Sequence, residues 1–150
     1  MNIIIHEPLT EKKEKTVYNP VVENEPSDEV KIMRISEEDD MTRIDFVYPV
    51  TEEVFRKYEA IDIKPKTFIR PCGSNIRLYL VRACGIPFAP AKYMLKGPGE
   101  MIYFTLFFPL LPKGTKAIDM IEIVNDKSNP YNIYGISLET IQREVIAIQN

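Results

Sequence analysis

The sequence predicts an all-β fold, a two-sheet antiparallel sandwich of roughly seven to nine strands with a short C-terminal helix. Short runs of β-branched, aromatic and aliphatic residues recur along the 150 residues, and 12 prolines mark where many of these runs stop. Turn signals separate the runs, and patterns typical of helices are few. Regular short strands of this kind favour two packed sheets over an α/β arrangement.

Length and composition indicate one folded domain. A chain of 150 residues with 45% hydrophobic and 27% charged residues can bury a substantial core. We expect residues 1–28, which hold the mixed-charge stretch 11–15, to form an N-terminal arm that is partly extended or mobile. Residues 29–138 are expected to form the sandwich domain, and residues 139–150 a helix packed on it.

Residues 30–36 and 41–48 predict a β-hairpin around the acidic turn 37–40. In the second arm, Ile44, Phe46 and Tyr48 alternate with residues of the other face, so one face is expected in the core and the other in solvent. The acidic turn lacks the alternating oxygen ligands and the central glycine of a calcium loop, so we do not expect a metal there.

The middle of the chain predicts one helical turn and several short strands. Residues 51–57 are consistent with a helical turn that Thr51 caps, with a loop as the alternative. Strands are expected over residues 58–64, 67–70 and 75–83, with a short extended piece over residues 92–95.

Residues 99–124 are expected at the centre of the fold, as two apolar runs joined by a connector rich in proline. Residues 101–108 are apolar on both faces of a strand, which predicts a central strand covered on both sides. Residues 118–124 alternate only in part, so this strand is expected to be less deeply covered. Asp119 interrupts it, and we interpret Asp119 as an outward-facing residue or one that bonds a neighbouring turn.

The end of the chain predicts a last strand over residues 131–138 and a helix after it. Apolar residues recur at steps of three and four, which places them on one stripe of a helix. The stripe consists of Leu138, Ile141, Val145 and Ile148. We expect the helix to pack over an open end or edge of the sheets, with docking on a partner as the alternative.

Charge and hydropathy exclude several classes of function. The net charge of −3 comes from interspersed basic and acidic side chains, which supply no basic stripe for nucleic acid. No apolar run approaches the roughly 18 residues that cross a bilayer, so the chain is not expected to span a membrane. The sequence shows no secretory signal. At face value it is cytoplasmic, with export as the alternative if a leader was removed.

The sequence contains no constellation of catalytic or cofactor-binding residues, so we expect neither an enzyme nor a cofactor. His6, the single histidine, lies in the arm, which removes histidine-based triads and zinc clusters from a folded cleft. The triplet Gly97-Pro98-Gly99 lacks the spacing of a phosphate-binding loop and is interpreted as a turn.

Two sets of residues carry the functional hypotheses. Tyrosine is favoured at protein interfaces, and five tyrosines are expected at strand ends or on strand faces. They are Tyr58, Tyr79, Tyr93, Tyr131 and Tyr134. Cys72 lies in a turn near Arg70, which would lower the pKa of its thiol and make it reactive. Cys84 lies too far along the next strand to form a disulfide with it.

Several motifs between residues 61 and 138 carry a family resemblance. They are IKPKTFI at 63–69, Gly85-Ile86, FFPLLPKGTK at 107–116, IDMIE at 118–122 and IYGISL at 133–138. Through them the chain resembles a bacterial immunoglobulin-like β-sandwich module found in front of thioredoxin-like domains in some exported thiol-disulfide proteins, and also alone. The resemblance implies an immunoglobulin-like sandwich with no assigned activity. It also implies a thioredoxin-like protein as a partner, although the sequence has no Cys-x-x-Cys motif of its own.

The hypothesis that follows is a non-catalytic binding or accessory module that acts through protein–protein interaction. Its partner and oligomeric state are unknown from the sequence. Two alternatives stay open. One is a thiol-dependent redox accessory protein that uses Cys72, and the other is a carbohydrate-binding module with exposed aromatic residues.

Overall fold

The computed structural model describes residues 16–23 and 29–139. Most of the expected N-terminal arm lies outside these residues, and so does all but the first residue of the helix expected over residues 139–150. The structure therefore describes the expected sandwich domain and a short part of the expected arm.

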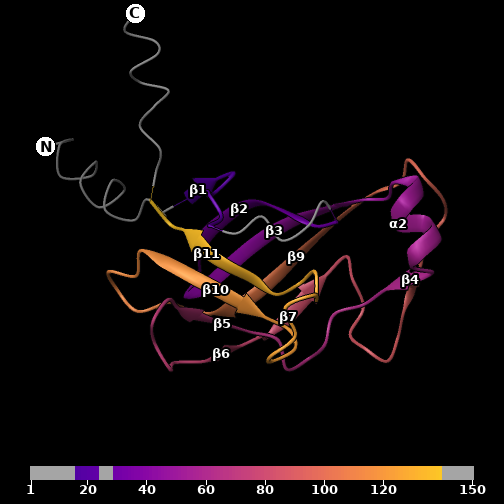
Figure 1. The fold of residues 1–150 in the computed structure, drawn as a ribbon. Coiled ribbons are helices and arrows are strands. Elements are labelled where there is room, and N and C mark those ends of the chain that lie inside the picture. The colour runs from indigo at the N-terminus through magenta and orange to yellow at the C-terminus, as the bar shows by residue number, and fades with distance from the viewer. Residues whose placement is uncertain (1–15, 24–28, 140–150) are drawn as a thin grey trace, which may run out of the picture.

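Most of the described chain is β-structure in antiparallel sheets, which confirms the all-β prediction. A five-stranded sheet has the order β1-β2-β3-β9-β7, and a four-stranded sheet has the order β11-β10-β5-β6 (Figure 1). The five-stranded sheet consists of β1 (Thr16–Tyr18), β2 (Lys31–Glu38), β3 (Met41–Pro49), β7 (Arg82–Cys84) and β9 (Met101–Pro109). The four-stranded sheet consists of β5 (Phe68–Pro71), β6 (Leu78–Tyr79), β10 (Ala117–Ile121) and β11 (Ile133–Ser137).

A short helix and a third, two-stranded sheet lie at the end of the long strands where β3 finishes (Figure 1). The helix α2 spans Glu52–Lys57, and the side chain of Thr51 accepts a hydrogen bond from Val54 N, as expected of its cap. The strands β4 (Ala60–Ile61) and β8 (Tyr93–Met94) form the small sheet. The strand expected over residues 58–64 therefore shrinks to two residues.

The predicted hairpin is present as β2 and β3. Its turn needs only Asp39 and Asp40, which have φ values of 47° and 65°. Two consecutive left-handed residues are typical of the tight turn that matches the twist of a hairpin. The expected inward face is also correct, since Ile44, Phe46 and Tyr48 are buried.

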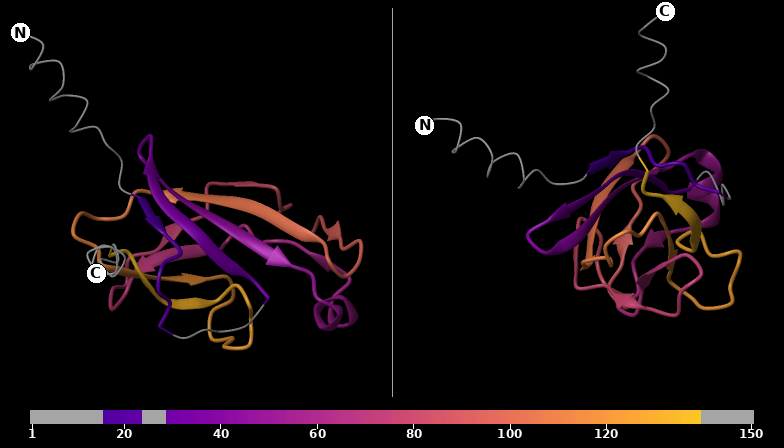
Figure 2. Two further views of the ribbon diagram at one scale, coloured as in Figure 1. Left: turned by 90° about the horizontal axis from the view of Figure 1, so that it is seen from above. Right: turned by 90° about the vertical axis from the view of Figure 1, so that its left-hand side faces the viewer.

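The two apolar runs of residues 99–124 belong to different sheets. The strand β9 lies between β3 and β7, as expected of an interior strand, and the two long strands β3 and β9 lie side by side (Figure 2). However, Met101 and Tyr103 are exposed, because their side chains lie on the face of the five-stranded sheet opposite the buried Ile102 and Phe104. Coverage of β9 on both sides was therefore wrong for its first half.

The strand β10 is more deeply buried than expected. It is an interior strand of the four-stranded sheet, between β5 and β11. Ile118 and Met120 are completely buried, and Asp119 is only 8% exposed. Residues 118–121 alternate only in part between apolar and polar residues, because both faces of the strand are buried. The core covers one face, and neighbouring side chains on the outer surface of the sheet cover the other.

Two segments of the chain pass from one sheet to the other. Residues 16–23 pair with β2 through β1, and Val22 then forms a bridge to Ile136 in β11. Residues 78–84 pair with β5 through β6 and with β9 through β7. The single strand expected over residues 75–83 is therefore two strands. Corners of this kind join the sheets along both sides of the fold.

One core lies between the sheets. The rings of Phe46 and Phe104 stack in parallel with their centroids 4.9 Å apart, and the ring of Tyr131 meets Phe104 edge-on. Ile118 and Ile136 come from the four-stranded sheet and are completely buried in the same core. Loss of one such large side chain typically costs about 2–5 kcal/mol.

The described residues contain no helix that is long and apolar enough to cross a membrane.

Candidate interaction surfaces

The five tyrosines singled out in the sequence do not form one surface. Tyr131 is buried in the core, so its expected exposure was wrong. Tyr58 and Tyr93 lie beside the small sheet and are partly exposed. Tyr79 is exposed and Tyr134 is partly exposed, and both lie on the four-stranded sheet.

Cys72 is exposed but is not an activated thiol. Its Sγ lies 3.3 Å from Asp119 Oδ1, which accepts a hydrogen bond from the thiol. Partial burial raises the pKa of Cys72, and the hydrogen bond and negative charge of Asp119 raise it further. Arg70 does not lower this pKa as expected, because its Nε forms an ion pair with Asp119 Oδ2 at 3.1 Å.

Asp119 bonds the neighbouring turn at Cys72, which is one of its two expected roles, and it also bonds two neighbouring strands. In addition to Arg70 and Cys72, it accepts a hydrogen bond of 2.9 Å from the backbone N–H of Gly135 in β11. The carboxylate thus joins β5, β10 and β11 on the outer surface of the four-stranded sheet. Both carboxylate oxygens of Asp119 accept hydrogen bonds from the surrounding sheet and turn, so the side chain has a structural role.

The outer face of the five-stranded sheet carries the most exposed tyrosines, which the sequence hypothesis did not include. Tyr18 is 65% exposed and Tyr103 is 60% exposed. Met33 and Met101 are exposed on the same face. We call this surface the arginine–tyrosine face. It consists of Tyr18, Met33, Arg34, Arg43, Asp45, Arg82, Met101, Tyr103 and Phe107.

The register of the strands builds the centre of this face. Tyr18, Arg34, Asp45, Thr105 and Cys84 are partners in successive strands, so their side chains form one row across the sheet. Residues that are far apart in the sequence are neighbours here only because β3 pairs with both β2 and β9.

Asp45 organises the charges of the row. It accepts hydrogen bonds from Arg34 Nε at 2.7 Å, Arg43 Nε at 3.1 Å and Thr105 Oγ1 at 2.6 Å. Burial alone would raise the pKa of Asp45, but the three hydrogen bonds outweigh it and hold the pKa below its usual value. The carboxylate thereby fixes two guanidinium groups on an open face.

Phe107 lies on the arginine–tyrosine face between its strand partners Arg43 and Arg82. The guanidinium groups of Arg82 and Arg43 lie 4.3 and 5.9 Å from the centre of its ring, so the ring is covered by two cations. A shallow hollow of about 440 Å³ adjoins this cluster, with Met33 and Tyr103 among its walls. The face therefore offers aromatic, methionine and arginine side chains around a depression.

The four-stranded sheet carries a second depression, of about 390 Å³, which we call the cationic groove. Its lining includes Phe68, Ile121 and Tyr134 together with three cationic side chains. The cations are Arg70, Arg77 and Lys127. The guanidinium carbon of Arg77 lies over the Phe68 ring, 4.6 Å from the centre of the ring.

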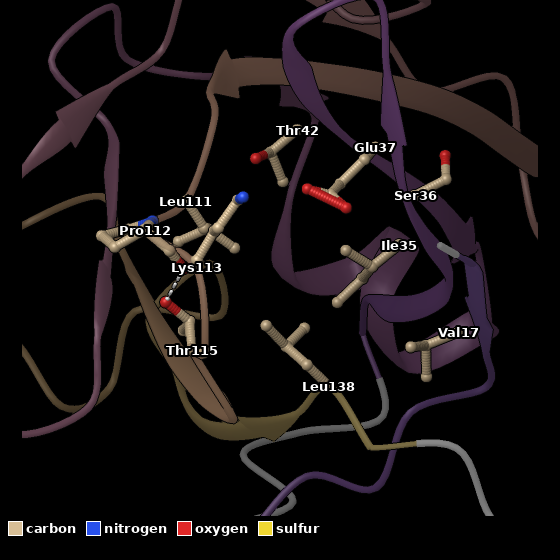
Figure 3. A pocket seen from close by; sticks show the side chains of 11 residues that line it. Val17, Ile35, Ser36, Glu37, Thr42, Leu111, Pro112, Lys113, Thr115 and Leu138 are labelled. Carbon is tan, nitrogen blue, oxygen red and sulfur yellow. Dashed lines mark hydrogen bonds between the residues drawn. The ribbon is translucent and has the colours of Figure 1, made fainter. Parts of the chain in front are cut away.

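A third cavity, of about 230 Å³, opens between β1, β2 and the 110–116 connector (Figure 3). Ile35, Leu111 and Leu138 supply apolar walls, and the side chains of Glu37 and Lys113 point toward each other across it. The helix expected over residues 139–150 would begin beside this cavity. Its packing on the fold stays a prediction, because the helix lies outside the described residues.

The described residues contain no cluster of three or more His, Cys, Asp or Glu side chains able to hold a metal ion. No family model, curated protein or solved structure matches the chain.

Proposed function

We propose that the chain is a non-catalytic immunoglobulin-like β-sandwich module that binds a protein partner through the arginine–tyrosine face. The fold class and the binding function rest on separate observations, which are the order of the strands and the composition of one face.

The strand order supports the immunoglobulin-like class. Constant-type immunoglobulin domains have one sheet in the order A-B-E-D and another that contains C, F and G. If β2 is taken as strand A, then β2-β3-β9-β7 corresponds to A-B-E-D and β11-β10-β5 corresponds to G-F-C. Every pair in this correspondence is antiparallel. The strands β1 and β6 are additions at the edges.

The composition of the arginine–tyrosine face carries the proposal of protein binding. Protein interfaces are enriched in aromatic residues, methionine and arginine relative to other surfaces. This face exposes Tyr18, Met33, Met101 and Tyr103 around the arginines that Asp45 fixes. Rigid tyrosines and arginines held by neighbours lose little conformational entropy on binding, which favours affinity.

The resemblance found between residues 61 and 138 suggests a thioredoxin-like protein as the first partner to test. Partial burial and the neighbouring Asp119 carboxylate both disfavour the Cys72 thiolate, which favours an accessory role over a redox role of Cys72 itself. We therefore propose an accessory role in which the module binds such a protein without exchanging thiols with it.

The test compares three forms of the protein as immobilised bait and in titration calorimetry against a purified thioredoxin-like protein. The forms are the wild type, a Tyr18→Ser/Tyr103→Ser variant of the face, and a Met94→Ser control. Met94 is 59% exposed but lies in β8 of the two-stranded sheet, outside this face.

Truncation of a hot-spot tyrosine typically weakens binding by about tenfold or more, and the losses at two residues of one interface do not simply add. We expect the wild type and the control to bind equally, and the face variant to bind at least about 30-fold more weakly with an unchanged melting temperature. Equal binding by all three forms, or no captured protein at all, would refute the proposal.

A further inference from the structure

We propose that the cationic groove binds an acidic peptide segment, with glutamate or aspartate carboxylates at Arg77 and Lys127 and apolar side chains on the groove's rim. This site lies on the opposite sheet from the arginine–tyrosine face, so it does not depend on the function proposed above.

The first argument is charge. The whole chain has a net charge of −3, yet three cations and no carboxylate line the groove. Among the described residues neither Arg77 nor Lys127 forms an ion pair, and Arg70 is paired with Asp119. The groove is therefore a local positive site on an acidic protein, which attracts anionic partners.

The carboxylates next to the groove are directed elsewhere. Asp126 Oδ1 accepts hydrogen bonds from the backbone N–H and the hydroxyl of Ser128, at 3.1 and 2.7 Å. Glu122 Oε2 accepts a hydrogen bond of 2.9 Å from Lys64 N on another loop. Neither carboxylate is arranged to neutralise the groove, so its cations are available to an external anion.

The second argument is preorganisation. The Arg77 guanidinium lies over the Phe68 ring, and Asp119 holds Arg70. A guanidinium group can bind a carboxylate with two parallel hydrogen bonds. Because the ring already restricts the side chain, less entropy is lost when the anion binds.

The third argument identifies the anion as part of a peptide. Apolar side chains lie beside the cations, since the exposed Val124 lines the groove and the exposed Tyr79 meets the ring of Phe68 edge-on. A small inorganic anion would leave these side chains in water. An extended segment, in which acidic and apolar residues alternate, would place carboxylates on the cations and cover the apolar rim at the same time.

The experiment is an NMR titration of the full chain, labelled with 15N, against the blocked hexapeptide Glu-Leu-Glu-Tyr-Glu-Leu. Three further probes are the Gln-for-Glu peptide, the Lys-for-Glu peptide and inorganic phosphate. We expect the acidic peptide to shift the amide signals of Phe68, Arg77 and Lys127, and the other three probes to bind at least about tenfold more weakly. Raising the NaCl concentration from 50 to 500 mM should weaken binding as well.

Variants then separate this site from the other face. Arg77→Gln and Lys127→Gln should each weaken peptide binding, Arg77→Gln by about tenfold or more, because a charge-assisted pair is lost. The matched charge change Lys92→Gln, next to β8, and the Tyr18→Ser/Tyr103→Ser variant should leave binding unchanged. The proposal is overturned if the shifts map outside the groove, if the Gln-for-Glu peptide or phosphate binds as tightly, or if Arg77→Gln has no effect.

Discussion

Removing the carboxylate of Asp119 should destabilise the fold and, at the same time, make Cys72 more acidic. The carboxylate is almost completely buried and accepts hydrogen bonds from Arg70, Cys72 and Gly135. The same side chain therefore stabilises the outer surface of the four-stranded sheet and holds the neighbouring thiol in its protonated form.

The magnitude follows from the three contacts. A hydrogen bond from a backbone N–H to a charged acceptor contributes about 1.5–3 kcal/mol, which is the loss expected at Gly135. The ion pair with Arg70, whose side chain is 32% exposed, contributes at most about 1 kcal/mol. The weak thiol donor adds little. Asp119→Ala should therefore lower the free energy of unfolding by about 2–4 kcal/mol.

Urea unfolding and thiol titration measure the two effects. Asp119→Asn, which keeps an oxygen for Gly135 N, should lose less stability than Asp119→Ala, and the exposed control Glu37→Gln should stay within about 0.5 kcal/mol of the wild type. In a Cys84→Ser background, the pH dependence of iodoacetamide labelling should show that Asp119→Asn lowers the pKa of Cys72. A loss below about 1 kcal/mol in Asp119→Ala, or an unchanged pKa, would refute the role assigned to the carboxylate.

Three further predictions concern the core and the acid side of the stability profile. The hydroxyl of Tyr131 is buried and has no hydrogen-bond partner within residues 16–23 and 29–139, so Tyr131→Phe should keep or raise the melting temperature, and a gain in stability of up to about 1 kcal/mol is expected. Gly85 has φ +89° and a Cβ there would lie 2.6 Å from the carbonyl oxygen of Tyr103, so Gly85→Ala should lower the urea midpoint more than Gly114→Ala, whose φ of +85° occurs in open space. The pKa of Asp45 in the folded state lies below its unfolded value of about 3.9. The stabilisation that Asp45 provides is therefore present above that pH and is lost as the pH falls through the folded pKa. In Asp45→Asn, the free energy of unfolding should fall less steeply as the pH is lowered through this range.

The hairpin of β2 and β3 could be predicted because its signals are local. Alternation within residues 41–48 identified the buried face, and the acidic pair at the turn consists of residues that tolerate positive φ. The cap of α2 at Thr51 was predictable for the same reason, since the capping side chain and the amide it accepts from are three residues apart.

The division of residues 75–83 between two sheets could not be predicted. A strand that changes sheets continues to alternate, so the period of two hides the corner. The exposure of Met101 and Tyr103 could not be predicted for a similar reason. Alternation places both side chains on one face of the strand, but it does not say whether that face is covered. Both side chains lie on the face of the five-stranded sheet opposite the core and stay in solvent.

The charged clusters were beyond sequence reasoning because they depend on long-range register. Asp45 and Thr105 are 60 positions apart, and Arg70 and Asp119 are 49 positions apart. Each pair meets only when two strands from distant parts of the chain align with a particular offset. Nothing in either local pattern encodes that offset, so an acidic residue inside an apolar run was the only visible sign of Asp119.

The way the sheets close favours recognition by faces over recognition by edges. An exposed edge strand can bind a partner by adding a strand, but this requires a row of free backbone groups. Here β1 and β7 each have three residues and β6 has two, and the chain at each of these edges continues into the other sheet. The fourth edge strand, β11, has five residues, and residues 21–23 already bond to Gly135 and Ser137 along it. A partner strand would find few consecutive groups to pair with. Binding should therefore depend on side chains, and substitutions on the two faces should affect it more strongly than proline substitutions at the edges.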